Sequence, residues 1–178
     1  MSSLTRAAAA AGTLAAIALA GSATQALAQR AQTAPGGQPV AGISCDAMEG
    51  QRIHIHQHLL ILDHGKSVPV PYDVGRPAGN QCLYWLHTHT PDGVIHIESP
   101  ANRTFTLGDF FAIWGQPLTT TRAASAFEKE GSKLKVWVDG KPYTGDPAKI
   151  SLVAHADIVI EAGPPFPTPP KFTDWNSR

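Results

Sequence analysis

The most regular pattern in the chain is an alternation of apolar residues and histidines over residues 52–62 (RIHIHQHLLIL). Successive side chains of a β-strand point to opposite faces of a sheet, so this segment predicts a strand with an apolar face and an imidazole face. The apolar face would carry Ile53, Ile55, Leu59 and Ile61, and the other face His54, His56 and His58. We therefore expect one side of this strand to pack on a core and the other to present imidazoles.

Similar patterns predict a chain built mostly of strands. Residues 82–89 (CLYWLHTH) and 94–98 (VIHIE) are separated by the turn sequence TPDG, which predicts a hairpin. Asp139 and Gly140 form a second hairpin signal. The remaining strands are expected at residues 67–70, 133–139, 141–144 and 156–161.

After residue 105 the apolar spacing changes to that of a helix. Residues 107–114 (LGDFFAIW) place their large apolar side chains in one stripe, with Thr106 as a suitable N-cap and Gly115 as a stop. A further helical turn is expected at residues 123–130. The fold class predicted is α+β and mostly β: an antiparallel or mixed sheet, β-grasp-like or a small open barrel, with one short helix packed on its apolar face.

Both ends of the chain are expected to lie outside the folded domain. Residues 1–28 combine a basic residue, an alanine-rich apolar stretch and small residues before the cleavage point, which is typical of a signal peptide. The later segments are a flexible lead-in (29–44), a single β-rich domain (45–163) and an extended Pro-rich tail (164–178). An aromatic residue of the tail, Phe166 or Phe172, is expected to hold it on the surface. The protein is thus predicted to be exported, periplasmic or secreted, and soluble after cleavage.

The composition limits which binding partners and which redox compartment are expected for the protein. Fourteen basic residues balance fourteen acidic ones, and no Lys/Arg-rich stretch occurs, so nucleic acid is not expected as a partner. No stretch of the mature chain is long and apolar enough to span a bilayer. The two cysteines, Cys45 and Cys82, are expected to form a disulfide in an oxidising compartment. Two reduced, buried thiols are the alternative.

The eight histidines cluster between His54 and His155 and indicate a metal site. On a strand, residues i and i+2 share a face about 6.6 Å apart, which two imidazoles can bridge to one ion, whereas residues i and i+4 lie about twice as far apart. The three histidines of residues 54–58 therefore cannot all bind one ion without a bulge. We predict a site made of two H-x-H pairs, His56 with His58 and His87 with His89, with His96 as a further ligand or supporting residue and His54 as a possible ligand.

Other polar residues of this region have weaker predicted roles. Glu98 shares a face with His96 and is expected to orient an imidazole or to accept a proton. His64 lies in a predicted turn and His155 stands alone near the end, so both are expected to be structural or exposed. The alternative for the whole group is that alternating histidines only line the solvent face of a half-buried sheet.

The donor types favour Cu(II) or Zn(II), since both accept all-imidazole ligation. Cu(I) would need Met or free Cys, and the mature chain offers only Met48 besides the two cysteines. Motifs for other chemistries are missing: HTHTPD lacks the Asp of a metallo-β-lactamase motif, and no HExxH, G-x-S-x-G, Walker or G-x-G-x-x-G sequence occurs.

The strings HIHQHLLIL, CLYWLHTHTPDGVIHIESP and RTFTLGDFFAIWGQPL resemble a family of uncharacterised exported bacterial and archaeal proteins. The resemblance covers most of the predicted domain. It implies that the histidine strands, the hairpin between them and the helix form one structural unit, but it implies no activity. Gln57 departs from the pattern, because a smaller residue is expected between the histidines.

Three functions fit these features. The first is an exported protein that binds a transition metal ion, Cu(II) or Zn(II), for storage, buffering or delivery. The second is a metal-dependent enzyme, in which three His ligands leave an open coordination position and Glu98 acts as base. The third is a structural or adhesion module with exposed histidines.

Overall fold

The computed structural model describes residues 37–79 and 81–175. The predicted signal peptide and most of the predicted lead-in lie outside these residues. Ile43 is completely buried and Val40 pairs with it in an isolated bridge, so packing begins a few residues before Cys45. Within the described residues, no helix combines the length and the apolar character needed to cross a bilayer.

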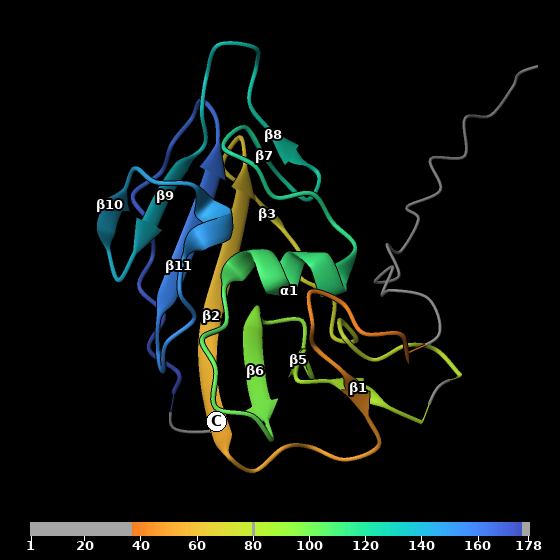
Figure 1. Ribbon diagram of the computed structural model, residues 1–178. Coiled ribbons are helices and arrows are strands. Elements are labelled where there is room, and N and C mark those ends of the chain that lie inside the picture. The colour runs from red at the N-terminus through yellow and green to blue at the C-terminus, as the bar shows by residue number, and fades with distance from the viewer. Residues whose placement is uncertain (1–36, 80, 176–178) are drawn as a thin grey trace, which may run out of the picture.

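Seven strands form one open, mixed sheet (Figure 1), with 35% of the chain in strands and 9% helical, which confirms the predicted fold class. The order is β10-β9-β11-β2-β6-β5, and β3 also pairs with β2. The pairing of β11 with β2 is parallel, while the other pairs are antiparallel. The strands are β2 (Ile53–Asp63), β3 (Lys66–Val68), β5 (Leu86–His87), β6 (Val94–Ser99), β9 (Lys135–Val138), β10 (Lys141–Tyr143) and β11 (Asp157–Ala162).

Two expectations about local structure need correction. The predicted strand over residues 82–89 is two short strands, β4 (Leu83–Tyr84) pairing with β1 (Cys45–Asp46) and β5 pairing with β6. The helical turn predicted at residues 123–130 is wrong. The chain there forms the hairpin β7 (Arg122–Ala123) and β8 (Ala126–Phe127), because Ala124 adopts a left-handed turn conformation with φ 52° and both paired alanines face the core. A short 3-10 helix, η2 (Pro147–Lys149), lies later in the chain.

The helix α1 (Leu107–Trp114) begins and ends where the sequence predicts. The Thr106 hydroxyl accepts a hydrogen bond from the Asp109 amide, and the Asp109 carboxylate accepts one from the Thr106 amide, so a capping box fixes the start. Gly115 ends the helix in the left-handed conformation, with φ 70°. The apolar side chains of α1 cover the core face of the sheet; they are Leu107, Phe110, Phe111, Ile113 and Trp114.

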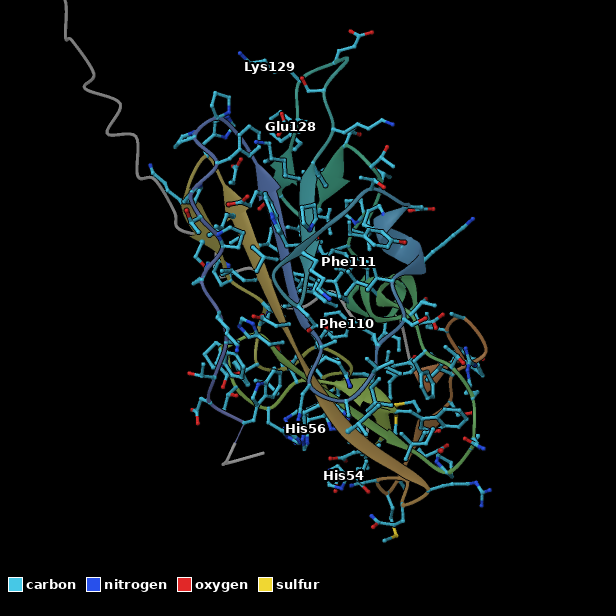
Figure 2. The ribbon with its side chains drawn as sticks, turned by 90° about the vertical axis from the view of Figure 1, so that its left-hand side faces the viewer. His54, His56, Phe110, Phe111, Glu128 and Lys129 are labelled. Atoms are coloured by element: carbon cyan, nitrogen blue, oxygen red, sulfur yellow. A yellow bond between two sulfur atoms is a disulfide. The ribbon has the colours of Figure 1, made fainter. Side chains whose placement is uncertain are left out.

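The register of the strands gives the sheet two different faces. Ile55 lies opposite Ile97 and packs in the core beneath α1, while the alternate residues of β2 and β6 point to the other face. Figure 2 shows Phe110 and Phe111 on one side of β2 and His54 and His56 on the other. The apolar and imidazole faces that the alternation predicts therefore exist, and the second one is called the outer face below.

The chain end after β11 runs across the outer face. The Lys135 ammonium lies 3.8 Å from the centre of the Phe166 ring, and the Phe172 ring stacks on His58 with centroids 4.0 Å apart. Trp175 stacks on His155 with centroids 4.8 Å apart. The expectation that tail aromatics hold this segment on the surface is confirmed.

The predicted disulfide between Cys45 and Cys82 is present. It connects the segment before β2 to the segment that enters β4, next to the ladder between β1 and β4. The described part of the chain holds no free cysteine. The alternative of two reduced thiols is therefore excluded, and neither cysteine is available as a metal ligand.

Candidate metal centre

Strand β6 is the centre of the histidine cluster, because both strands that carry the histidine pairs are hydrogen-bonded to it. The antiparallel register of β2 and β6 sets His56 opposite His96 and His54 opposite Glu98. The register of β5 and β6 sets His87 opposite His96 from the other side. Residues directly opposite each other in a sheet share a face, so these side chains all project from the outer face.

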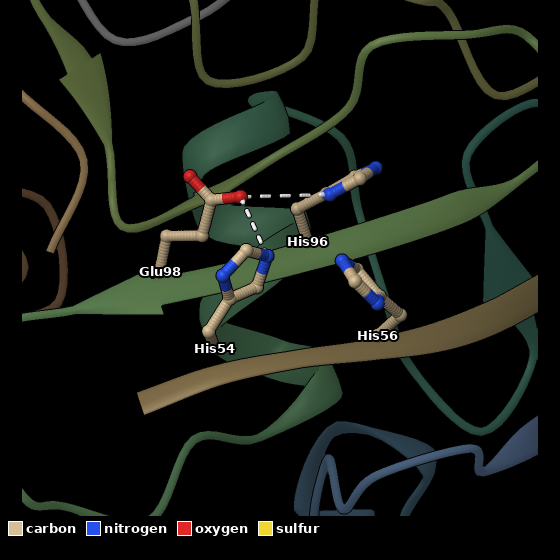
Figure 3. A group of neighbouring side chains, drawn as sticks. All are labelled: His54, His56, His96 and Glu98. Atoms are coloured by element: carbon tan, nitrogen blue, oxygen red, sulfur yellow. Dashed lines mark ion pairs between the residues drawn. The ribbon is translucent and has the colours of Figure 1, made fainter. Parts of the chain in front are cut away.

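The first group of potential ligands lies between β2 and β6 and consists of His54, His56, His96 and Glu98 (Figure 3). One ligand atom from each of them lies within 4.8 Å of all the others. Nε2 of His54 is 3.3 Å, and Nδ1 of His96 is 3.7 Å, from Oε1 of Glu98. The His56 and His96 rings meet edge to face with centroids 4.5 Å apart. Small rotations of these rings would bring four donors around one ion.

The second group lies between β5 and β6 and consists of His87, His89, His96 and Glu98, again within 4.8 Å of one another. The Nε2 atoms of His87 and His89 are 3.1 Å apart, close to the spacing of two ligands on one ion. Nε2 of His87 is also 3.6 Å from Oε2 of Glu98. The two groups share His96 and Glu98, so the outer face holds one continuous cluster of five imidazoles and one carboxylate.

His87 is prepared for ligation by its surroundings. Its side chain is completely buried, and this burial lowers its pKa to about 4 despite a hydrogen bond to the backbone carbonyl of Tyr84, which acts in the opposite direction. Nδ1 donates that bond, at 2.9 Å, so the lone pair of the neutral ring is on Nε2. This is the atom that faces His89 and Glu98, and backbone orientation of the far nitrogen is the usual support of a histidine ligand.

Glu98 is 4% exposed, and burial together with a hydrogen bond and charge repulsion from Glu49 raises the pKa of its carboxyl, while His54 acts in the opposite direction. Glu49 also acts electrostatically on His89. The alternation of apolar and polar residues does not point to Glu49, because this residue lies in the loop before β2, outside every strand pattern. Its only sequence signal is an acidic side chain close to the start of a histidine-bearing strand.

His58 lies apart from both groups. The parallel pairing of β11 with β2 sets Asp157 opposite His58, and the His58 Nδ1 atom is 2.9 Å from Oδ1 of Asp157. Burial raises the pKa of Asp157, but the hydrogen bonds from His58 and the Phe172 amide outweigh it, so the pKa is lowered overall. Stacking by Phe172 covers the other side of the imidazole. His58 therefore helps to hold the tail.

The histidine pairs that the structure brings together differ from the predicted combination. The two H-x-H strands are not neighbours, since β6 lies between them, and the pair that β2 supplies is His54 with His56 instead of His56 with His58. The expectation that only one neighbouring pair of the three can serve one ion agrees with the geometry. His64 is exposed in a turn, where Nδ1 is 2.7 Å from Asp63, and His155 packs on Trp175.

A pocket of about 380 Å³ lies beside the first group. His54 and His56 line it together with Ile55, Ala154 and His155. The cluster can therefore be reached from outside at the β2 side, whereas His87 at the β5 side is enclosed. No known protein family, curated protein or solved structure matches this chain.

Proposed function

We propose that the chain is an exported protein that binds a transition metal ion, Cu(II) or Zn(II), for storage, buffering or delivery. The observation that carries this proposal is the convergence of five imidazoles and one buried carboxylate, from β2, β6 and β5 with the residues that follow it, on one face of the sheet. Its ligands are His54, His56, His87, His89, His96 and Glu98.

Burial distinguishes this cluster from histidines that only line a solvated face. His56, His87 and His96 are all less than 10% exposed, and Glu98 is buried with them. Imidazoles and a carboxylate gathered in a largely buried group are a donor set that transition metal ions take. This burial supports metal binding over a structural or adhesion module with exposed histidines.

The donor set supports Cu(II) or Zn(II). Imidazole nitrogen and carboxylate oxygen suit both ions, and Cu(II) generally binds such sites more tightly. Thiolate ligation is excluded because both cysteines are in the disulfide. Met48 is 80% exposed, which makes it a poor candidate for completing a buried Cu(I) site.

Export is supported by two independent features. The first 28 residues have the pattern of a signal peptide. The disulfide is typical of proteins that fold in an oxidising compartment. The resemblance of the histidine strands to a family of exported proteins points in the same direction.

Metal titration tests the proposal. Protein freed of metal with a chelator is titrated with Cu(II) and with Zn(II) in a calorimeter, for the parent, for Glu98→Ala and for the control His64→Ala. Because Glu98 belongs to both groups, its replacement should weaken binding at least about 10-fold, while His64→Ala should bind like the parent. The proposal is wrong if the parent binds neither ion or if Glu98→Ala binds as tightly as the parent.

The pocket beside His54 and His56 favours a second candidate function, a metal-dependent enzyme. A small molecule in this pocket would be next to the metal, as catalysis at an open coordination position requires. Glu98 faces three imidazoles and is better placed as a ligand than as a base. Azide added to the Cu(II) protein separates the candidates: a new charge-transfer band indicates an exchangeable position, and an unchanged spectrum indicates a closed binding site.

A further inference from the structure

Glu98 directs each of its two carboxylate oxygens toward a different set of imidazoles. Oε1 is 3.3 Å from Nε2 of His54 and 3.7 Å from Nδ1 of His96 (Figure 3). Oε2 is 3.6 Å from Nε2 of His87. A carboxylate in this orientation can bind one ion through each oxygen.

The two sets approach Glu98 from opposite sides. His54 and His56 belong to β2, while His87 ends β5 and His89 follows it, and β6 lies between these strands. Neighbouring strands are about 4.8 Å apart, so β2 and β5 are separated by roughly 10 Å. Each set reaches ligand distance only together with the shared residues of β6. The arrangement provides two adjacent positions for ions, one on each side of Glu98.

We infer that the cluster holds two transition metal ions bridged by Glu98, an inference that rests on the proposed function. The first ion takes His54, His56, Nδ1 of His96 and Oε1 of Glu98. The second takes His87, His89 and Oε2 of Glu98. Ions in two-metal sites are typically about 3.5–4 Å apart, which a bridging carboxylate can span.

The charges around the second position support a second cation. Glu49 acts electrostatically on both Glu98 and His89, so its carboxylate adds negative charge to the side where the fewest protein ligands lie. The positive charge of Arg76 disfavours a cation at this position, because its Nη1 atom is 3.5 Å from Nδ1 of His89. Its side chain is exposed and its contact is long, so Arg76 can turn toward solvent, whereas His87 is fixed by the Tyr84 carbonyl.

Stoichiometry tests the inference. The full chain is equilibrated with excess Zn(II) or Cu(II), dialysed, and analysed for metal per chain. The parent should hold two ions. His54→Ala/His56→Ala and His87→Ala/His89→Ala should each hold one ion, and the control His64→Ala should hold two. Circular dichroism of each variant checks that the sheet remains folded.

Electron paramagnetic resonance of the Cu(II) forms adds a readout that is independent of the count. Two Cu(II) ions joined by one carboxylate couple magnetically, so the loaded parent should give less signal than two isolated ions, while each double variant should give one full mononuclear signal. A parent that holds one ion, or two ions without coupling, overturns the bridged pair and leaves the proposed function intact. A parent that holds no ion overturns both.

Discussion

Gln57 places an amide on the core face of β2, opposite Ile95 and beneath the helix. It is completely buried, and neither its amide nitrogen nor its oxygen has a hydrogen-bond partner among the described residues. A buried amide without a partner costs free energy on the order of 1–3 kcal/mol. A smaller residue is expected here from the sequence, and the structure shows the larger amide buried on the core face of the strand.

Gln57→Met should therefore stabilise the protein. Methionine has nearly the same length and no polar atom to desolvate, so we expect the free energy of unfolding to rise by about 1 kcal/mol. Urea unfolding of metal-free protein measures the change. Gln51→Met, at an exposed position before β2, is the matched control and should change little. A loss of stability in Gln57→Met would show that the amide has a favourable role in the core.

His87 should make the stability of the metal-free protein depend on pH. Burial lowers its pKa in the folded state to about 4, from 6.5 in the unfolded chain, so the unfolded chain binds the proton first. The stability that His87 contributes is complete above pH 6.5 and is lost as the pH falls toward 4, by up to about 3 kcal/mol. Urea unfolding at several pH values measures this slope.

His87→Gln removes the titrating group and should flatten the slope between pH 6.5 and 4 relative to the parent. The control His64→Gln changes an exposed imidazole in a turn and should keep the parent slope. Equal slopes for parent and His87→Gln would contradict the lowered pKa of the buried imidazole.

The tail is the element that covers the β2–β11 side of the outer face. Phe172 contributes both its ring, stacked on His58, and its backbone amide, which donates to Asp157. These contacts connect the tail to two central strands of the sheet. Because His58 belongs to neither ligand group, the tail and the metal cluster should be separable by mutation.

Phe172→Ala should loosen the tail without changing metal affinity. Loss of the aromatic contact should lower the free energy of unfolding by about 1 kcal/mol and speed proteolytic cleavage of the chain end. Cu(II) titration should match the parent. Phe127→Ala, at a site that is 59% exposed, is the control and should affect neither measurement. A large loss of Cu(II) affinity in Phe172→Ala would show that the tail completes the centre.

At the scale of the whole molecule, the disulfide should account for a large part of the stability. Cys45 and Cys82 are 37 residues apart in sequence, and closing a loop of that size stabilises a fold by about 4 kcal/mol in the chain-entropy model. Urea unfolding of Cys45→Ala/Cys82→Ala should show a loss of this order. Mass spectrometry of the non-reduced parent should find two hydrogens fewer than in the reduced form. Intact free thiols in the non-reduced protein would contradict the pairing.

Local patterns were enough to predict β2, β6, α1 and the disulfide, because each depends on side chains close in sequence or on a single possible pairing. The order of the strands in the sheet could not be predicted from such local patterns. Nothing in the local sequence indicates that β6 lies between β2 and β5, and this order decides which histidines meet.

The dependence on long-range strand pairing also explains why the predicted site included His58 and missed Glu49. His54 and His58 are equally far from His56 along the strand. The register with β6 places His54 opposite Glu98 but His58 opposite Val94, and His58 meets Asp157 of the last strand instead. Glu49 acts electrostatically on Glu98 from a loop with no periodic pattern. The membership of the cluster thus depends on long-range contacts, while the existence of an imidazole face depends only on alternation.

The parallel pairing of β2 with β11 also determines when this protein can finish folding. His58 and Asp157 are 99 residues apart in sequence, yet their strands are neighbours in the middle of the sheet. Contacts of such high contact order form slowly, typically in milliseconds to seconds for sheet proteins. Until the last strand arrives, β2 keeps an open edge that invites pairing with other chains. Any partly synthesised or clipped chain that lacks β11 should therefore be prone to aggregation.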